Sequence, residues 1–193
     1  MGELAARRTE STVARTMPVW EPKADEPVGA KEMLGRRIFT DNIWDGTLGN
    51  GRQQFRVDHF LDLNPEADLS VDRLGRSSEE GPVVRRVGPH AHTEGDKRSP
   101  PRHFTGWAAC GRNHFATAKC NVPVQPRPLE DGTNPYHAEI VRDDYRAGSG
   151  LYAFATMIRD VISQQGHFQI SPPRRTPKGS GSEADASGRP TSP

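Results

Sequence analysis

The chain has 193 residues and a formal net charge of +1, with 33% hydrophobic and 26% charged residues. Leu, Ile, Val and Phe number 34, about 18% of the chain, which is below the roughly 20% expected of a packed core. High net charge, the second mark of a disordered chain, is missing. No run approaches the ~18 apolar residues of a membrane-spanning helix, and no heptad pattern persists. We therefore expect neither a membrane protein nor a coiled coil, but one modest domain with unstructured ends.

The two ends of the chain differ in composition from its middle. Residues 1–33 contain three prolines among charged and small residues, with no helical or strand period, and predict a disordered arm in which Met17 is an alternative start to Met1. Residues 171–193 contain no Leu, Ile, Val or aromatic residue, so they cannot bury enough surface to offset the entropy of ordering. The segment between them, 34–170, is about 22% Leu, Ile, Val and Phe and predicts a single domain.

Short segments with alternating or β-branched residues dominate this domain and predict strands. A glycine-rich stretch at 45–51 lies between the first two, and its Asn50-Gly51 pair predicts a hairpin turn. The segment between His92 and His103 is interpreted as a mobile surface loop. The predicted strands fall at 37–44, 55–61, 69–74, 82–87, 104–110, 114–118, 121–125 and 136–142.

One helix is predicted, near the end of the domain. Its apolar residues have the spacing of a single stripe, with Ser149 as the expected N-cap and Gly166 as the expected C′ residue. The stripe consists of Leu151, Phe154, Ala155, Ile158, Val161 and Ile162. The expected fold is therefore α+β: a small, mostly antiparallel sheet with this C-terminal amphipathic helix packed on one face.

Two features concern the compartment. Cys110 and Cys120 are too few for a disulfide scaffold, and the N-terminus lacks the apolar stretch of a secretory signal. We expect a cytoplasmic protein with both thiols reduced.

Histidines and cysteines supply a candidate zinc site. His90 and His92 would share one face if their segment were a strand, because side chains alternate along a strand. Zinc needs four nitrogen or sulfur ligands, or three and a water, although the short ligand spacings of strong zinc motifs are missing. The candidate ligands are His90, His92, Cys110, His114, Cys120 and His137.

The segment His137-Ala138-Glu139 resembles the opening of the zinc deaminase signature, in which the histidine binds the metal and the glutamate transfers protons. That family also needs two cysteines downstream, and none follows Cys120. A strand with His137 and Glu139 on one face explains the same residues, so we reject the deaminase interpretation.

Basic residues cluster between 85 and 102, where they outnumber the acidic ones and precede two aromatic residues. Such a cluster could bind nucleic acid, while a solvated basic loop is the simpler interpretation at this near-zero net charge. The candidate contacts are Arg85, Arg86, Lys97, Arg98 and Arg102.

No catalytic signature emerges, and we assign no catalytic residue from the sequence. The favoured interpretation is a non-enzymatic binding or accessory protein that acts through a surface for another protein. The alternative is a metal-dependent hydrolase or nuclease that uses the His and Cys residues between 90 and 137, with Glu139 nearby. Convergence of three or more of these side chains on one point would favour the alternative.

Overall fold

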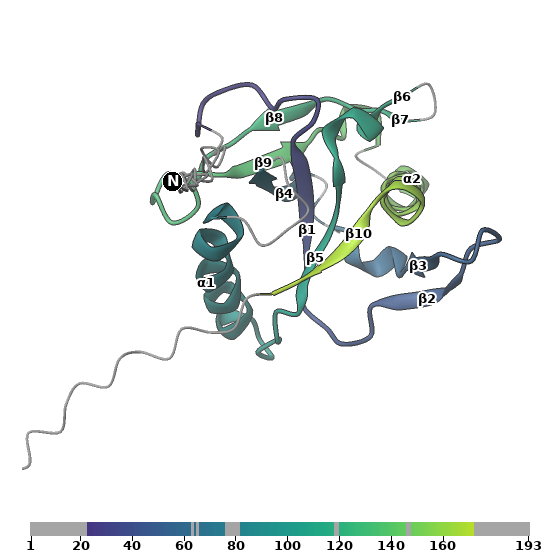
Figure 1. The fold of residues 1–193 in the computed structure, drawn as a ribbon, viewed down its shortest axis with the longest axis horizontal. Coiled ribbons are helices and arrows are strands. Elements are labelled where there is room, and N and C mark those ends of the chain that lie inside the picture. Colours follow the sequence, from purple (N-terminus) through teal and green to yellow (C-terminus); the bar gives the residue numbers. More distant parts are fainter. Residues whose placement is uncertain are drawn as a thin grey trace, which may run out of the picture.

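Six strands form one antiparallel sheet in the order β10-β5-β1-β4-β9-β8 in the computed structural model, which describes residues 23–171 except 63, 65, 76–81, 118–119 and 146–147. Their bounds are β1 (Met33–Ile38), β4 (Leu69–Gly75), β5 (Gly106–Gly111), β8 (Val124–Pro126), β9 (His137–Ile140) and β10 (His167–Ile170). Two helices, α1 (Pro82–Lys97) and α2 (Ser149–Gln165), lie on opposite sides of this sheet (Figure 1). The predicted α+β class with an antiparallel sheet is confirmed.

Smaller elements decorate the sheet. β2 (Trp44–Thr47) and β3 (Gln53–Phe55) form a hairpin, and Gly51 at its turn has a φ of 82°, a conformation that glycine adopts at no steric cost. The hairpin predicted from Asn50-Gly51 is therefore present. The remaining short elements are η1 (Val57–His59), η2 (Arg112–Phe115), β6 (Ala116–Thr117), β7 (Cys120–Asn121) and η3 (Asp143–Tyr145).

Helix α2 buries the stripe that the sequence predicted. Phe154, Ala155, Ile158 and Ile162 are almost fully buried in the larger of two apolar clusters. The helix begins at Ser149, so its N-cap is Gly148 and the prediction of Ser149 as the N-cap is wrong by one residue; Gly166 follows the last helical residue. Packing of this stripe against the sheet holds the helix in place, since burial of each large apolar side chain contributes about 1.5–3 kcal/mol.

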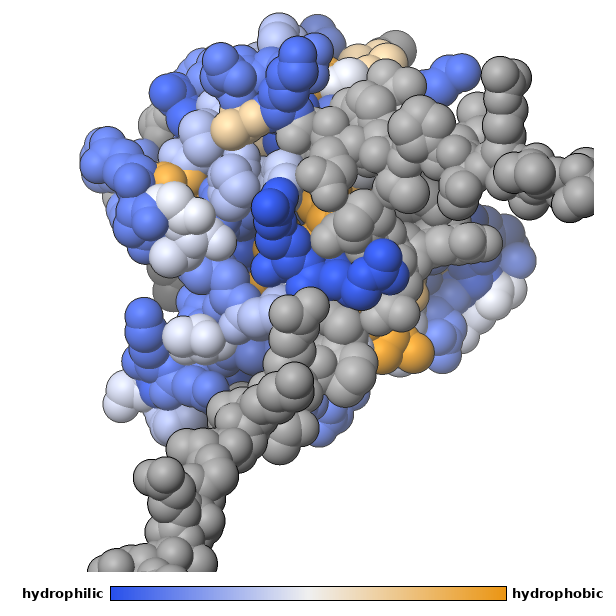
Figure 2. All heavy atoms as spheres, turned by 60° about the vertical axis from the view of Figure 1, so that its left-hand side comes forward, coloured by the Kyte–Doolittle hydropathy of each residue, from blue (hydrophilic) through white to orange (hydrophobic). Residues whose placement is uncertain are grey.

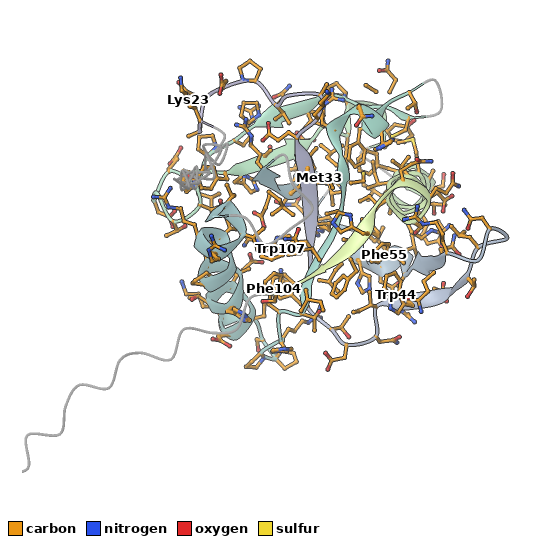
Figure 3. The ribbon with its side chains drawn as sticks, in the orientation of Figure 1. Lys23, Met33, Trp44, Phe55, Phe104 and Trp107 are labelled. Atoms are coloured by element: carbon orange, nitrogen blue, oxygen red, sulfur yellow. The ribbon has the colours of Figure 1, made fainter. Side chains whose placement is uncertain are left out.

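Helix α1 corrects the sequence prediction, which placed a strand at 82–87 and a mobile loop after His92. Val83, Val84, Val87 and Ala91 are buried, at a spacing that fits one helical face. They pack in the second apolar cluster with Phe104 and Trp107, which lie beside α1 in Figure 3, away from Trp44 and Phe55 near the hairpin. Burial of this face outweighs the cost of Pro89 inside the helix, where proline removes one backbone hydrogen bond.

The central strands are buried on both faces, which explains how a chain with few aliphatic residues forms a core. In β5, Trp107 and Ala109 face α1, whereas Ala108 and Cys110 face α2, and all four are fully buried. Small and aromatic residues thus replace Leu, Ile and Val in the core.

The two ends of the chain were predicted to be disordered. Most of the predicted arm (1–33) and tail (171–193), namely residues 1–22 and 172–193, lies outside the described residues, whereas residues 23–33 are described and Met33 begins β1. Residues just before β1 contact the sheet, because Glu32 pairs with Arg73 of β4. No helix among the described segments is long and apolar enough to cross a bilayer.

Candidate functional site

Strands β1 and β4 separate at one end of the sheet. Their pairing runs from Met33–Gly75 to Gly35–Asp72 and stops there, although β1 continues to Ile38 and β4 begins at Leu69. The guanidinium of Arg36 lies beside this gap: Nη1 donates to the carbonyl of Ser70 (3.0 Å) and Nε to that of His59 (2.9 Å). A cavity of about 290 Å³ lies at this opening, between the sheet and α1.

A buried carboxylate forms one wall of this cavity. Asp72 accepts two hydrogen bonds from Arg37 (2.7 and 2.8 Å), one from the indole of Trp107 (2.7 Å) and one from Asn134 (2.7 Å). Burial alone would raise the pKa of Asp72, but the charge and hydrogen bonds of Arg37 outweigh it, so the pKa lies below its ordinary value. Asp72 is therefore an ionised anchor for Arg37.

The ion pairs continue outward from Arg37. Its Nη1 also pairs with Glu94 of α1, which in turn accepts from Arg98 (2.6 Å). The guanidinium of Arg98 lies over the ring of Phe39, 4.0 Å from its centroid. The alternating charges of Asp72, Arg37, Glu94 and Arg98 compensate one another and hold both arginines in defined positions.

Two histidines line the same cavity. Nδ1 of His137 lies 2.6 Å from the carbonyl oxygen of Arg127, which can only accept, so we assign the proton to Nδ1 and an acceptor lone pair to Nε2. His90 lines the cavity from α1, and its buried Nδ1 has no hydrogen-bond partner among the described residues. Burial, assisted by the charge of Arg37, lowers the pKa of His90, which keeps its imidazole neutral at pH 7. We call this space the histidine cavity.

A second space adjoins the histidine cavity and shares Arg36, Arg37, Phe39 and Arg98 with it. Its volume is about 450 Å³, and its charged lining consists of five arginines, one aspartate and His59. We call it the arginine groove; its arginines are Arg36, Arg37, Arg56, Arg98 and Arg102, and its aspartate is Asp58.

Three of the groove's arginines have carboxylate partners and two do not. Arg37 and Arg98 belong to the ion pairs described above, and Arg56 pairs with Asp58 (2.9 Å). No carboxylate among the described residues is within ion-pair distance of Arg36 or Arg102. The groove therefore carries an excess of positive charge. Most of the described residues visible on the α1 side of the molecule are hydrophilic (Figure 2).

The structure brings together two of the six candidate metal ligands. His90 and His137 both line the histidine cavity, whereas His92 contacts the hydroxyl of Ser171 (2.9 Å) and His114 lies in η2. His90 and His92 were expected on one face of a strand; they lie on a helix instead, where residues two apart point in different directions.

The two cysteines lie in the core against α2. Cys110 and Cys120 are almost fully buried, and burial raises the pKa of both thiols, that of Cys120 to about 11. They are therefore protonated thiols at pH 7. No group of three or more His, Cys, Asp or Glu side chains in the described part of the chain is arranged to hold a metal ion, so zinc binding stays a prediction from sequence without geometric support.

The five basic residues proposed for nucleic acid are spread along α1 and the loop after it. Arg85 and Arg86 are exposed near the start of the helix, where Arg86 donates to the hydroxyl of Tyr136 (2.5 Å). Lys97 is exposed at its end, and only Arg98 and Arg102 reach the arginine groove. Nucleic-acid binding stays a prediction.

Sequence reasoning did not select the residues at the centre of the site, Arg36, Arg37 and Asp72, because they lie in or beside segments interpreted only as strands. A signal was present: Arg36-Arg37 and Asp72-Arg73 interrupt the apolar alternation of two segments that a core must bury. Charged side chains in such positions are paired or bind something, since burying an uncompensated charge is costly.

No protein-family model matches the chain, and comparisons with curated proteins and with solved structures find no match. Function must therefore come from the chemistry of the histidine cavity and the arginine groove.

Proposed function

We propose that the protein is a non-enzymatic binding protein for a small anionic ligand, whose phosphate or carboxylate group occupies the arginine groove. The observation that carries this proposal is the presence of two arginines without a carboxylate partner, Arg36 and Arg102, in a groove lined by five. The expectation of a binding protein is thereby kept, with a small anion in place of a protein partner.

The surroundings of Arg36 support an anionic ligand. Burial lowers the pKa of Arg36, and the nearby charge of Asp62 offsets this only in part. Its hydrogen bonds go to two neutral carbonyls, although a guanidinium has five donors arranged to suit phosphate or carboxylate. An anion in the groove would compensate a charge that the protein alone leaves poorly compensated.

The ion pairs behind the groove support tight binding. Arg37 and Arg98 are held by Asp72, Glu94 and the ring of Phe39, so binding an anion would cost them little side-chain entropy. Their own charges are largely compensated, which leaves Arg36 and Arg102 to supply the attraction.

Titration calorimetry of the full chain with inorganic phosphate at low salt tests the proposal. We expect measurable binding that weakens as salt is added, because salt screens exposed charges. Arg102→Gln should weaken phosphate binding about tenfold, in line with the ~1.5–3 kcal/mol of a charge-assisted hydrogen bond. The matched control is Arg127→Gln, which removes an exposed arginine that lines neither space.

Absence of phosphate binding by the wild-type chain would overturn the proposal. So would equal affinities of the wild type and the Arg102→Gln variant, provided that circular dichroism shows both to be folded.

A further inference from the structure

The histidine cavity opens beside the arginine groove, and the two spaces differ in charge. We propose that the ligand is a phosphorylated compound in which the phosphate occupies the arginine groove and an uncharged polar ring occupies the histidine cavity. This inference rests on the proposed function and assigns the second part of the ligand.

The first argument is continuity. Arg36, Arg37, Phe39 and Arg98 line both spaces, so the two spaces lie side by side, and a molecule that occupies both would contact these four side chains. The separation of β1 from β4 beyond Gly35 and Asp72 creates the opening.

The second argument is charge. The lining of the histidine cavity carries three arginines and three carboxylates, those of Asp62, Asp72 and Glu94, so its formal charges cancel, although no carboxylate among the described residues is within ion-pair distance of Arg36. The lining of the arginine groove carries five arginines and one carboxylate, so it has an excess of positive charge. An anionic group is attracted more strongly to the groove than to the cavity. An uncharged polar group suits the cavity, because burying it there costs less desolvation free energy than burying a charge.

The third argument is hydrogen bonding. His90 and His137 both line the cavity, and Nε2 of His137 can accept a bond because its Nδ1 donates to the carbonyl of Arg127. Leu129 and Phe39 add apolar surface to the same lining. Hydroxyl or amide groups on a ring would pair with the two imidazoles, while the ring's faces contact the apolar residues.

The fourth argument is size. A water molecule occupies about 30 Å³ in the liquid, so the cavity's 290 Å³ corresponds to roughly ten waters. That is the size of one sugar ring or one nucleobase. A sugar phosphate joins a phosphate directly to one polar ring, and a nucleoside monophosphate carries a base on the sugar that bears its phosphate, so either could place a ring in the cavity.

Calorimetry with three probes tests this inference on the full chain: inorganic phosphate, ribose 5-phosphate and adenosine 5′-monophosphate. At least one of the two organic phosphates should bind ten times more tightly than inorganic phosphate or better. Leu129→Trp, which places an indole in the half-buried lining of the cavity, should abolish that advantage and leave the affinity for inorganic phosphate unchanged.

The matched control is Leu48→Trp, in the β2–β3 hairpin outside both spaces, which should keep the wild-type order of affinities. His137→Gln is a second variant that weakens only the ring's binding, and it applies if Leu129→Trp does not fold. Preference for ribose 5-phosphate would identify a sugar as the ring, and preference for the nucleotide would identify a base.

Two results would overturn the inference and leave the proposed function standing. One is that inorganic phosphate binds but neither organic phosphate binds more tightly. The other is that the advantage survives in folded variants at Leu129 and His137. If the wild-type chain binds none of the three probes, the proposed function itself is overturned.

Discussion

Glu32 and Arg73 are the most completely buried charged residues that face each other in the described chain. Both side chains have 0% exposure, and Nε and Nη2 of Arg73 donate to the two carboxylate oxygens of Glu32 (2.5 and 3.1 Å). Each side chain also bonds to the backbone, because Arg73 donates to the carbonyl of Lys23 and Glu32 accepts from the amide of Gly29. The pair joins the segment before β1 to the middle of the sheet.

Removal of either partner should be costly, because it leaves an uncompensated charge in the core. We expect Glu32→Leu and Arg73→Met each to lower the free energy of unfolding by about 3–5 kcal/mol. The double variant should lose less than the sum of the two, since it leaves no unpaired charge. Urea denaturation of the three variants measures these differences.

The control is the pair of exposed Arg127 and half-buried Glu139, in which Nε of Arg127 lies 3.7 Å from a carboxylate oxygen of Glu139. Arg127→Gln should change the free energy of unfolding by no more than about 1 kcal/mol, as surface ion pairs do. Additive losses in the double variant would show that Glu32 and Arg73 do not act as a pair.

At the scale of elements, the two helices show what the sequence could and could not predict. The stripe of α2 runs without interruption from Leu151 to Ile162, so its period is visible and the helix was found. In α1 the buried residues are followed by a polar stretch, and Pro89 and Gly95 interrupt the pattern. Tertiary packing against Trp107 stabilises that helix, and the helix propensities of its residues do not predict this packing.

The candidate site was less predictable than the fold. Arg36 and Asp72 come from two strands far apart in the sequence, and only the pairing of β1 with β4 brings them together. Neither segment's sequence predicts that this pairing ends at Gly35. The sequence shows that the chain is rich in arginine, but the excess positive charge of the groove depends on which arginines pair with carboxylates. Only the folded chain determines that pairing.

Gly95 lies in the last turn of α1 and packs against the following loop, which carries two arginines of the groove, Arg98 and Arg102. A Cβ atom at this position would lie 2.3 Å from the carbonyl oxygen of Arg102, and the carbonyl of Gly95 accepts from the amides of Arg98 and Arg102. Because the clash is with backbone, the loop must move to relieve it.

We therefore expect Gly95→Ala to reduce the free energy of unfolding by about 1–3 kcal/mol, the usual cost of overpacking. It should also weaken phosphate binding, because Arg98 and Arg102 would shift. The control is Gly49→Ala in the hairpin, where a Cβ meets nothing within 4 Å and φ is ordinary. Thermal unfolding and calorimetry measure the two effects, and equal behaviour of both variants would contradict the role given to Gly95.

At the scale of the whole molecule, most buried charges are carboxylates and arginines that compensate one another, so histidines control stability just below neutral pH. Burial outweighs the nearby charge of Asp58 and lowers the pKa of His59, whose Nε2 lies 3.2 Å from the carbonyl oxygen of Ile43. Burial, assisted by Arg52, also lowers the pKa of His167. The folded chain thus favours the neutral form of both imidazoles.

The sign of the pH dependence follows from linkage. As the pH falls below about 6.5, the unfolded chain takes up protons on these histidines before the folded chain does, so stability is full above that pH and declines toward the lowered folded pKa values. Carboxylates such as Asp72 and Glu94 also have lowered pKa values. Their contribution to the stability of the fold is therefore lost only at a more acidic pH, below about 4.5. Between pH 6.5 and 5 the histidines dominate. We expect the thermal unfolding midpoint to decrease from pH 7 to 5.5, and His59→Gln and His167→Gln each to flatten that decrease; a midpoint that is constant or rises toward pH 5.5 would contradict the neutral, buried state assigned to both rings.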